Sequence, residues 1–84
     1  MVPQCTMERS DPKATRRILA RNVRRLRTTR GLSQEELAQE IGLRQAQISE
    51  IESGANNITL DNLHRLAVAL GVRPCELIDE RLKD

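Results

Sequence analysis

The 84-residue sequence contains no phenylalanine, tryptophan or tyrosine, so any hydrophobic core must be built from aliphatic side chains. Proteins that bind single-stranded nucleic acid commonly stack the bases on aromatic rings, and the lack of such rings argues against that class. The chain has two cysteines, which are too few for a disulfide framework, and neither stands in a spacing typical of metal ligands. We therefore expect no bound metal and no cofactor.

Long apolar stretches are also missing. No segment reaches the roughly 18 consecutive apolar residues of a transmembrane helix, and the first residues lack the apolar region of a secretion signal. His64 is the single histidine, and no serine, cysteine or carboxylate forms a plausible catalytic constellation with it. These absences predict a cytoplasmic protein that does not associate with membranes and is not an enzyme.

Positive charge is concentrated in the first part of the chain. Eight basic residues and no acidic residue lie between Pro12 and Gln34, whereas residues 31–84 carry ten acidic residues and five basic ones. A basic segment is either an electrostatic footprint for phosphate groups or a solvated helix face. The sequence leaves both interpretations open.

A chain of this length forms one domain, which we place at residues 11–84, after a flexible arm of residues 1–10. Apolar residues recur with helical spacing in five segments, so the predicted fold class is all-α. The first helix should begin at Pro12 with Asp11 as its cap. The expected helices cover residues 12–30, 33–41, 45–53 and 60–70, and a fifth begins at Pro74 and includes Leu77 and Ile78, while the inclusion of Leu82 is left open. The residues predicted to face inward are Leu19, Val23, Leu26, Leu37, Ala38, Ile41, Ile48, Ile51, Leu60, Leu63, Leu66, Ala67, Leu70, Leu77 and Ile78.

Residues 33–53 combine two short helical segments with a tight turn. Ser33 and Glu36 form the pattern of a capping box at the start of the first segment, and Gly42 ends that segment. Only Leu43 and Arg44 separate it from the second segment. This pattern is typical of a helix-turn-helix, whose second helix presents its first residues to base edges in the major groove. It predicts a sequence-specific transcriptional regulator that binds double-stranded DNA.

The order and spacing of several further residues match one family of such proteins. They are Leu26-Arg27, Gly31 to Ala38, Ile48 to Gly54, Leu60, Leu63, Leu66-Ala67 and Ala69 to Val72. Through them the sequence resembles the Cro and phage-repressor type of helix-turn-helix regulator, also called xenobiotic response element-like. The resemblance implies a compact five-helix, lambda-repressor-like domain. It also implies a stand-alone regulator, such as a phage-type repressor or a restriction–modification controller protein.

The resemblance assigns DNA contacts to both helices of the motif. Gln34 matches a residue that touches phosphate and supports the second helix. Gln45 matches the residue that reads adenine through its N6 and N7 atoms. Ala46 and Gln47 occupy the next base-facing positions, where Ala46 offers an apolar contact to a thymine methyl group. Ser49 belongs to the same expected contact set.

Other positions depart from the family pattern or lie outside the two helices. Arg44 stands where the family often has a capping residue, so the cap is lost but a cation is placed near the DNA backbone. Asn22 replaces a common arginine, and Glu50 stands where the family often has a basic residue. Asn56 and Asn57 resemble the loop that contacts the backbone.

The resemblance also places Arg27 of the first helix in contact with Glu52 of the third. Each residue follows a predicted core position, so both lie at the edge of faces that must pack together. Because a buried charge without a partner costs several kcal/mol, we expect a buried ion pair. Its expected role is to orient the second helix of the motif.

Partners are predicted by the same reasoning. One recognition helix covers only a few base pairs, so we expect a homodimer that binds two half-sites of an operator. The surplus apolar residues expected at its interface, on the fourth and fifth helices, are Val68, Leu77, Ile78 and Leu82.

Two further interpretations remain open. Glu35, Glu36 and Glu40 form either a solvated capping face or a contact patch for RNA polymerase. Because the recognition helix carries little positive charge, the alternative function is a protein-interaction module, such as an antitoxin or adaptor with reduced DNA binding.

Overall fold

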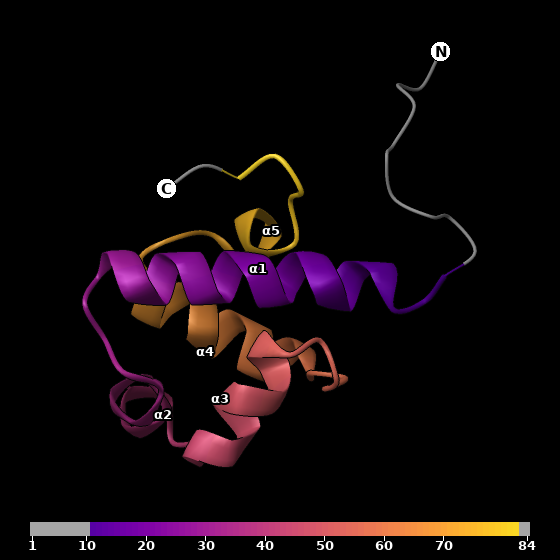
Figure 1. The fold of residues 1–84 in the computed structure, drawn as a ribbon. Coiled ribbons are helices and arrows are strands. Elements are labelled where there is room, and N and C mark those ends of the chain that lie inside the picture. The colour runs from indigo at the N-terminus through magenta and orange to yellow at the C-terminus, as the bar shows by residue number, and fades with distance from the viewer. Residues whose placement is uncertain (1–10, 83–84) are drawn as a thin grey trace.

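The computed structural model describes residues 11–82 (Figure 1), and the expected arm of residues 1–10 lies outside them. Within the described residues the chain is all-α, as predicted, and none of its helices combines the length and apolar character needed to cross a bilayer. The helices are α1 (Ala14–Thr29), α2 (Gln34–Ile41), α3 (Gln45–Glu52), α4 (Leu60–Leu70) and α5 (Pro74–Leu77).

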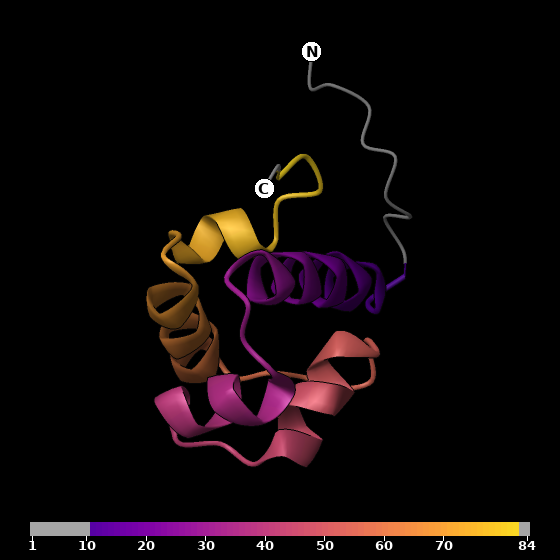
Figure 2. The same cartoon turned by 60° about the vertical axis from the view of Figure 1, so that its left-hand side comes forward.

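The long helix α1 runs through the middle of the molecule. Helices α2, α3 and α4 lie on one side of it, and α5 lies on the other (Figures 1 and 2). Helix α1 contacts α3, α4 and α5, while α2 contacts α3 and α4. Helices α1 and α4 therefore pack against the inner side of the α2–α3 pair, and the outer side of α3 is not covered by another helix.

The start of α1 differs from the prediction. The helix begins at Ala14, two residues later than expected. The Asp11 carboxylate accepts a hydrogen bond from the Lys13 N–H (2.9 Å), and the Asp11 carbonyl accepts one from the Ala14 N–H (3.1 Å). Residues 11–13 thus form a turn that precedes the helix, because Asp11 bonds to the backbone two residues on instead of capping a helix at Pro12.

An aliphatic core fills the space between the helices. Its buried members are Leu19, Val23, Leu26, Leu37, Ala38, Ile41, Ile48, Ile51, Leu63, Leu66, Ala67, Leu70 and Leu77. Two residues predicted to face inward are exposed instead, namely Leu60 (81% exposed) and Ile78. Leu60 is the first residue of α4 and lies in a groove open to solvent. Ile78 follows the end of α5, where helical spacing no longer applies.

The fifth helix is shorter than predicted, and Asn22 supplies a reason. Asn22 is buried (1% exposed) in the middle of α1. Its Nδ2 donates hydrogen bonds to the carbonyls of Leu77 and Asp79, both at 2.9 Å. The first of these bonds satisfies the carbonyl of the last α5 residue, which has no partner within the helix, and the second holds the turn that follows. Asn22 therefore fastens the end of α5 to α1, so the departure from the family's common arginine has a structural role.

Candidate nucleic-acid interface

Helix α2 begins with the predicted capping box. Ser33 Oγ accepts a hydrogen bond from the Glu36 N–H (3.0 Å), and Glu36 Oε1 accepts one from the Ser33 N–H (2.8 Å). These two bonds satisfy backbone donors that have no partner inside the helix. The hydrogen bonds from Ser33 also hold the pKa of the Glu36 carboxyl below its usual range. The local sequence therefore determines where α2 begins.

The turn between α2 and α3 depends on Gly42. Its backbone has φ +72°, in the left-handed region that side chains with a Cβ rarely adopt. The chain reverses there and enters α3 after Leu43 and Arg44. Arg44 and the first α3 residues, Gln45 and Ala46, are exposed, as is Ser49 one turn later. The structure therefore brings four of the predicted contact residues onto the outer side of α3.

Gln47 supplies one half of a capping box at the start of α3. An arginine side chain has no acceptor, so Arg44 cannot cap the helix. Instead, Gln47 Oε1 accepts a hydrogen bond from the Arg44 N–H at 2.9 Å. The Gln47 side chain is half-buried and turned toward the start of its own helix. Its amide nitrogen keeps two donors, whereas its oxygen is engaged in this capping bond.

Arg27 connects α1 to the last residue of α3. Its Nε donates to Glu52 Oε2 (2.6 Å) and its Nη2 donates to Glu52 Oε1 (3.0 Å), which is the bidentate geometry of a strong pair. The two side chains are 12% and 6% exposed. Hydrogen bonding to Glu52 raises the pKa of the Arg27 guanidinium further above its already high value. The pair is therefore charged and largely removed from water.

Two further hydrogen bonds extend this network to α2. Arg27 Nη1 donates to the Leu32 carbonyl (2.7 Å), and Gln34 Nε2 donates to Glu52 Oε1 (3.1 Å). The Glu52 carboxylate thus accepts hydrogen bonds from Arg27 of α1 and from Gln34, the first residue of α2. The network links α3 to both helices. Gln34 is half-buried, and its amide nitrogen has a second hydrogen that a phosphate oxygen can accept.

The loop after α3 holds the two predicted asparagines in different ways. Asn56 Nδ2 donates to Glu50 Oε1 at 3.3 Å, so its amide is turned toward α3. Asn57 is exposed. Glu50 therefore holds the loop near α3, which is a role that the sequence pattern did not indicate.

The helix-turn-helix geometry agrees with a comparison of the sequence with protein families. A model of the helix-turn-helix family HTH_3 matches residues 23–77, which include all of α2, α3 and α4. The chain belongs to this family.

Curated relatives support the same assignment. A hypothetical transcription factor of Neisseria meningitidis is 42% identical over 79 residues, which make up 90% of this chain and 74% of that protein. Control protein C.BamHI of Bacillus amyloliquefaciens is 42% identical over 65 residues, which make up 76% of this chain and 80% of that protein.

A solved structure shows the same fold together with DNA. The structure of the restriction–modification controller protein C.Esp1396I, a tetramer in complex with its natural 35 base-pair operator, matches this chain with a TM-score of 0.70 and 30% identity. The match covers 82% of this chain and 96% of that one. Together the comparisons confirm a lambda-repressor-like fold and a DNA-binding transcriptional regulator of the Cro/C1 type, not an enzyme.

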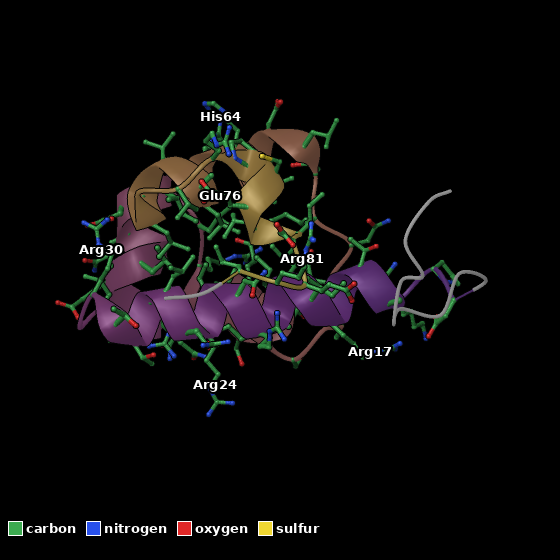
Figure 3. All side chains as sticks on the ribbon, turned by 90° about the horizontal axis from the view of Figure 1, so that it is seen from above. Arg17, Arg24, Arg30, His64, Glu76 and Arg81 are labelled. Carbon is green, nitrogen blue, oxygen red and sulfur yellow. The ribbon has the colours of Figure 1, made fainter. Side chains whose placement is uncertain are left out.

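A shallow hollow beside α3 contains one residue that the sequence reasoning missed. It is lined by Arg24, Arg27, Gln34, Ser49, Glu52 and Ser53. Arg24 is exposed, and in Figure 3 it projects from α1 on the side opposite α4 and α5. The basic segment between Pro12 and Gln34 is compatible with a contact with phosphate, but the sequence alone does not show which of its arginines lies beside α3.

Proposed function

We propose that the protein regulates transcription as a homodimer that places one α3 in each of two major-groove half-sites of an operator. The observation that carries this proposal is the exposed start of α3, held in position by the Arg27–Glu52 pair. A single α3 covers only a few base pairs, whereas two half-sites about 34 Å apart supply a longer operator. The controller protein C.Esp1396I, whose solved complex is a tetramer on a 35 base-pair operator, supports this reading.

Within a half-site, we assign base reading to Gln45 and Ala46. The exposed Gln45 amide has the donor and acceptor needed to bond adenine through N6 and N7. Ala46 offers its methyl group to a thymine. We assign contacts with the DNA backbone to Gln34, Arg44 and Asn57. The remaining predicted residues, Gln47, Ser49 and Asn56, stay in the contact set as supporting polar groups.

A binding-site selection from random duplexes tests the role of Gln45. A bidentate amide contact contributes about 1–3 kcal/mol of discrimination between bases. Gln45→Ala should therefore lose its preference at one base pair of each half-site and keep the wild-type thermal midpoint. Gln39→Ala, which removes an exposed amide from α2, is the matched control and should select the wild-type sequence. Selection of an unchanged sequence by Gln45→Ala would contradict the assignment.

The dimer interface predicted from the sequence needs correction. Leu77 is completely buried and is therefore not available to a partner, and Leu82 is partly buried because it packs against the core. Val68 is 66% exposed but lies in a hollow beside Glu40 and Arg65. The four residues predicted for the interface therefore do not form one continuous apolar surface.

A different apolar face fits a second copy of the chain better. Exposed Leu60 and Ile78 lie in a groove between the start of α1, the loop before α4 and the end of α5. The other apolar residues that line it are Pro12, Leu19, Ile58 and Leu63. Because the loop connects directly to α3, pairing at this face keeps the two recognition helices close to the interface. We assign the dimer interface to this groove.

Two matched substitutions on α4 test the interface. Leu60→Glu should convert the dimer to a monomer in sedimentation velocity and weaken binding to a two-half-site duplex, because it buries a charge in the interface. Val68→Glu places the same charge eight residues further along α4 and should leave the dimer intact. Both positions are exposed, so neither change disturbs the core. A wild-type monomer at high micromolar concentration would contradict the dimer, and dissociation by Val68→Glu alone would contradict the chosen face.

The acidic face of α2 is a second candidate surface for protein contact. Glu35 and Glu40 are exposed, while the Glu36 carboxylate is engaged with Ser33. We propose that Glu35 and Glu40 are available to RNA polymerase when the protein is bound at an operator in the cytoplasm. A transcription assay with Glu35→Gln and Glu40→Gln tests this. Loss of regulation with normal operator affinity is expected, and unchanged regulation would contradict it.

A further inference from the structure

The helix-turn-helix itself supplies little attraction for DNA. Residues 33–53 contain a single basic residue, Arg44, and the acidic residues Glu35, Glu36, Glu40, Glu50 and Glu52. The phosphate backbone provides much of the affinity of DNA-binding proteins, and it does so through cations. Positive charge must therefore come from another element that borders α3, and α1 is the basic helix that contacts α3.

The arginines of α1 point in different directions, and most of them are already engaged. Arg27 is paired with Glu52. Arg17 forms an ion pair with Asp11 at 2.8 Å. Arg21 donates to the Glu80 carbonyl at the C-terminal side of the domain. None of these three arginines therefore supplies a net positive charge to the surface beside α3.

Arg16 lines the groove assigned to the dimer interface and is not among the residues that line the hollow beside α3. Arg24 differs from all of these. Within residues 11–82 it has no carboxylate partner, and its side chain lines the hollow beside α3 together with Gln34 and Ser49. Figure 3 shows it extending away from the body of the domain on the side opposite His64 and Glu76.

The charge of the hollow is favourable for an anion. Glu52 lies in its wall, but Arg27 neutralises that carboxylate through two hydrogen bonds. Gln34 provides an amide donor at the first residue of α2, where backbone N–H groups also lack partners within the helix. Arg24 therefore contributes the uncompensated charge of this hollow, and its neighbours contribute neutral donors.

We propose that Arg24 binds a phosphate of the DNA backbone next to the major groove that α3 enters, with Gln34 as the neighbouring donor. This assignment rests on the proposed insertion of α3 into the groove. It adds a contact from outside the helix-turn-helix. Arg24 increases the affinity and fixes the position of the protein along the DNA, because contacts with phosphate carry no direct sequence information. The bases are read by α3.

The salt dependence of binding tests the assignment. The probes are a duplex selected from a random pool by the wild-type protein and a scrambled duplex of the same length, and affinity is measured by fluorescence anisotropy over a series of KCl concentrations. Each phosphate neutralised by a protein cation contributes about 0.9 to the slope of log affinity against log salt concentration. Because the proposed dimer carries two copies of Arg24, Arg24→Gln should reduce the slope by about twice this amount on both duplexes and leave their affinity ratio unchanged.

Three controls make the result specific. Arg24→Lys should restore the slope, because the slope counts charges and not the shape of the side chain. Arg65→Gln removes the same charge from the surface of α4 and should keep the wild-type slope. The thermal midpoint of Arg24→Gln should equal that of the wild type, since the residue is exposed.

The two possible failures are distinguishable. If the wild-type protein binds neither duplex at low salt, the proposed function is wrong and this assignment falls with it. If the wild-type protein binds but Arg24→Gln keeps its slope, the Arg24 assignment alone is wrong. A loss of affinity confined to the selected duplex would also overturn it, because that result indicates base reading.

Discussion

The ion pair between Arg27 and Glu52 allows a quantitative test of how α3 is held. Arg27→Met would leave the Glu52 carboxylate, which is 6% exposed, with Gln34 as its remaining side-chain partner. Glu52→Leu would leave the guanidinium with the Leu32 carbonyl as its acceptor. In each case a largely buried charge loses its counterion. Either substitution should lower the free energy of unfolding by about 3–5 kcal/mol.

The double variant is expected to behave differently. Replacing both members of a buried ion pair by apolar residues of similar volume is often close to neutral. The losses of the two single variants should therefore not add, and the coupling energy should amount to several kcal/mol. An exposed pair gives about 0–1 kcal/mol in the same experiment. Whether the pair is buried or exposed therefore decides which coupling energy is expected.

The measurement is a double-mutant cycle from urea unfolding followed by far-UV circular dichroism. All variants are compared at one protein concentration, because association with a partner subunit changes the apparent stability. The pair between Arg17 and Asp11 is a matched control: its atoms are 2.8 Å apart, close to the 2.6 Å of the Arg27–Glu52 pair, but its side chains are much more exposed. Its cycle should give the small coupling of an exposed pair.

The result that refutes the reasoning is simple additivity. If Arg27→Met and Glu52→Leu each cost less than about 1 kcal/mol and their losses add in the double variant, the pair behaves as a surface pair. It would then not fix the orientation of α3. If the coupling energy is large but the double variant keeps its operator affinity, the pair stabilises the fold and does not orient α3 for DNA binding.

Three further predictions concern other parts of the fold. Asn22→Leu should lower the free energy of unfolding by about 1–3 kcal/mol in urea titrations, because it leaves the buried Leu77 carbonyl without its side-chain donor. Faster hydrogen exchange after α5 is expected, and unchanged exchange would contradict the role of Asn22. Gly42→Ala should cost about 1–2 kcal/mol from backbone strain alone, since nothing lies within 4 Å of the added Cβ, and Gly42→Asn should cost less. The lowered pKa of Glu36 makes the cap of α2 contribute stability above about pH 4.3, the ordinary value for glutamate, and lose it as the pH falls through the folded-state pKa. Glu36→Gln should flatten this part of an acid unfolding curve, and an unchanged curve would show that the cap is not the cause.

The local sequence alone determined where most helices begin and end. Ser33 and Glu36 satisfy each other's backbone donors within four residues, so the start of α2 needs no information from elsewhere. Gly42 and Gly71 end helices because each adopts a positive φ at the helix terminus. The helical spacing of aliphatic residues likewise predicted most of the core. These features depend on neighbours a few residues apart, which is the range over which a sequence pattern is informative.

Features that depend on distant residues were decided by the tertiary structure. Asn22 meets the carbonyls of Leu77 and Asp79 across more than fifty positions of chain, and this contact determines where α5 is fastened. Leu60 shares the apolar character of the core, yet it lies at the start of α4 in an open groove. The basic run showed that α1 is positively charged, but the rotation of α1 about its axis places Arg24 beside α3. A helix distributes consecutive side chains around its axis, so only its packing against the other helices decides which of them face a common surface.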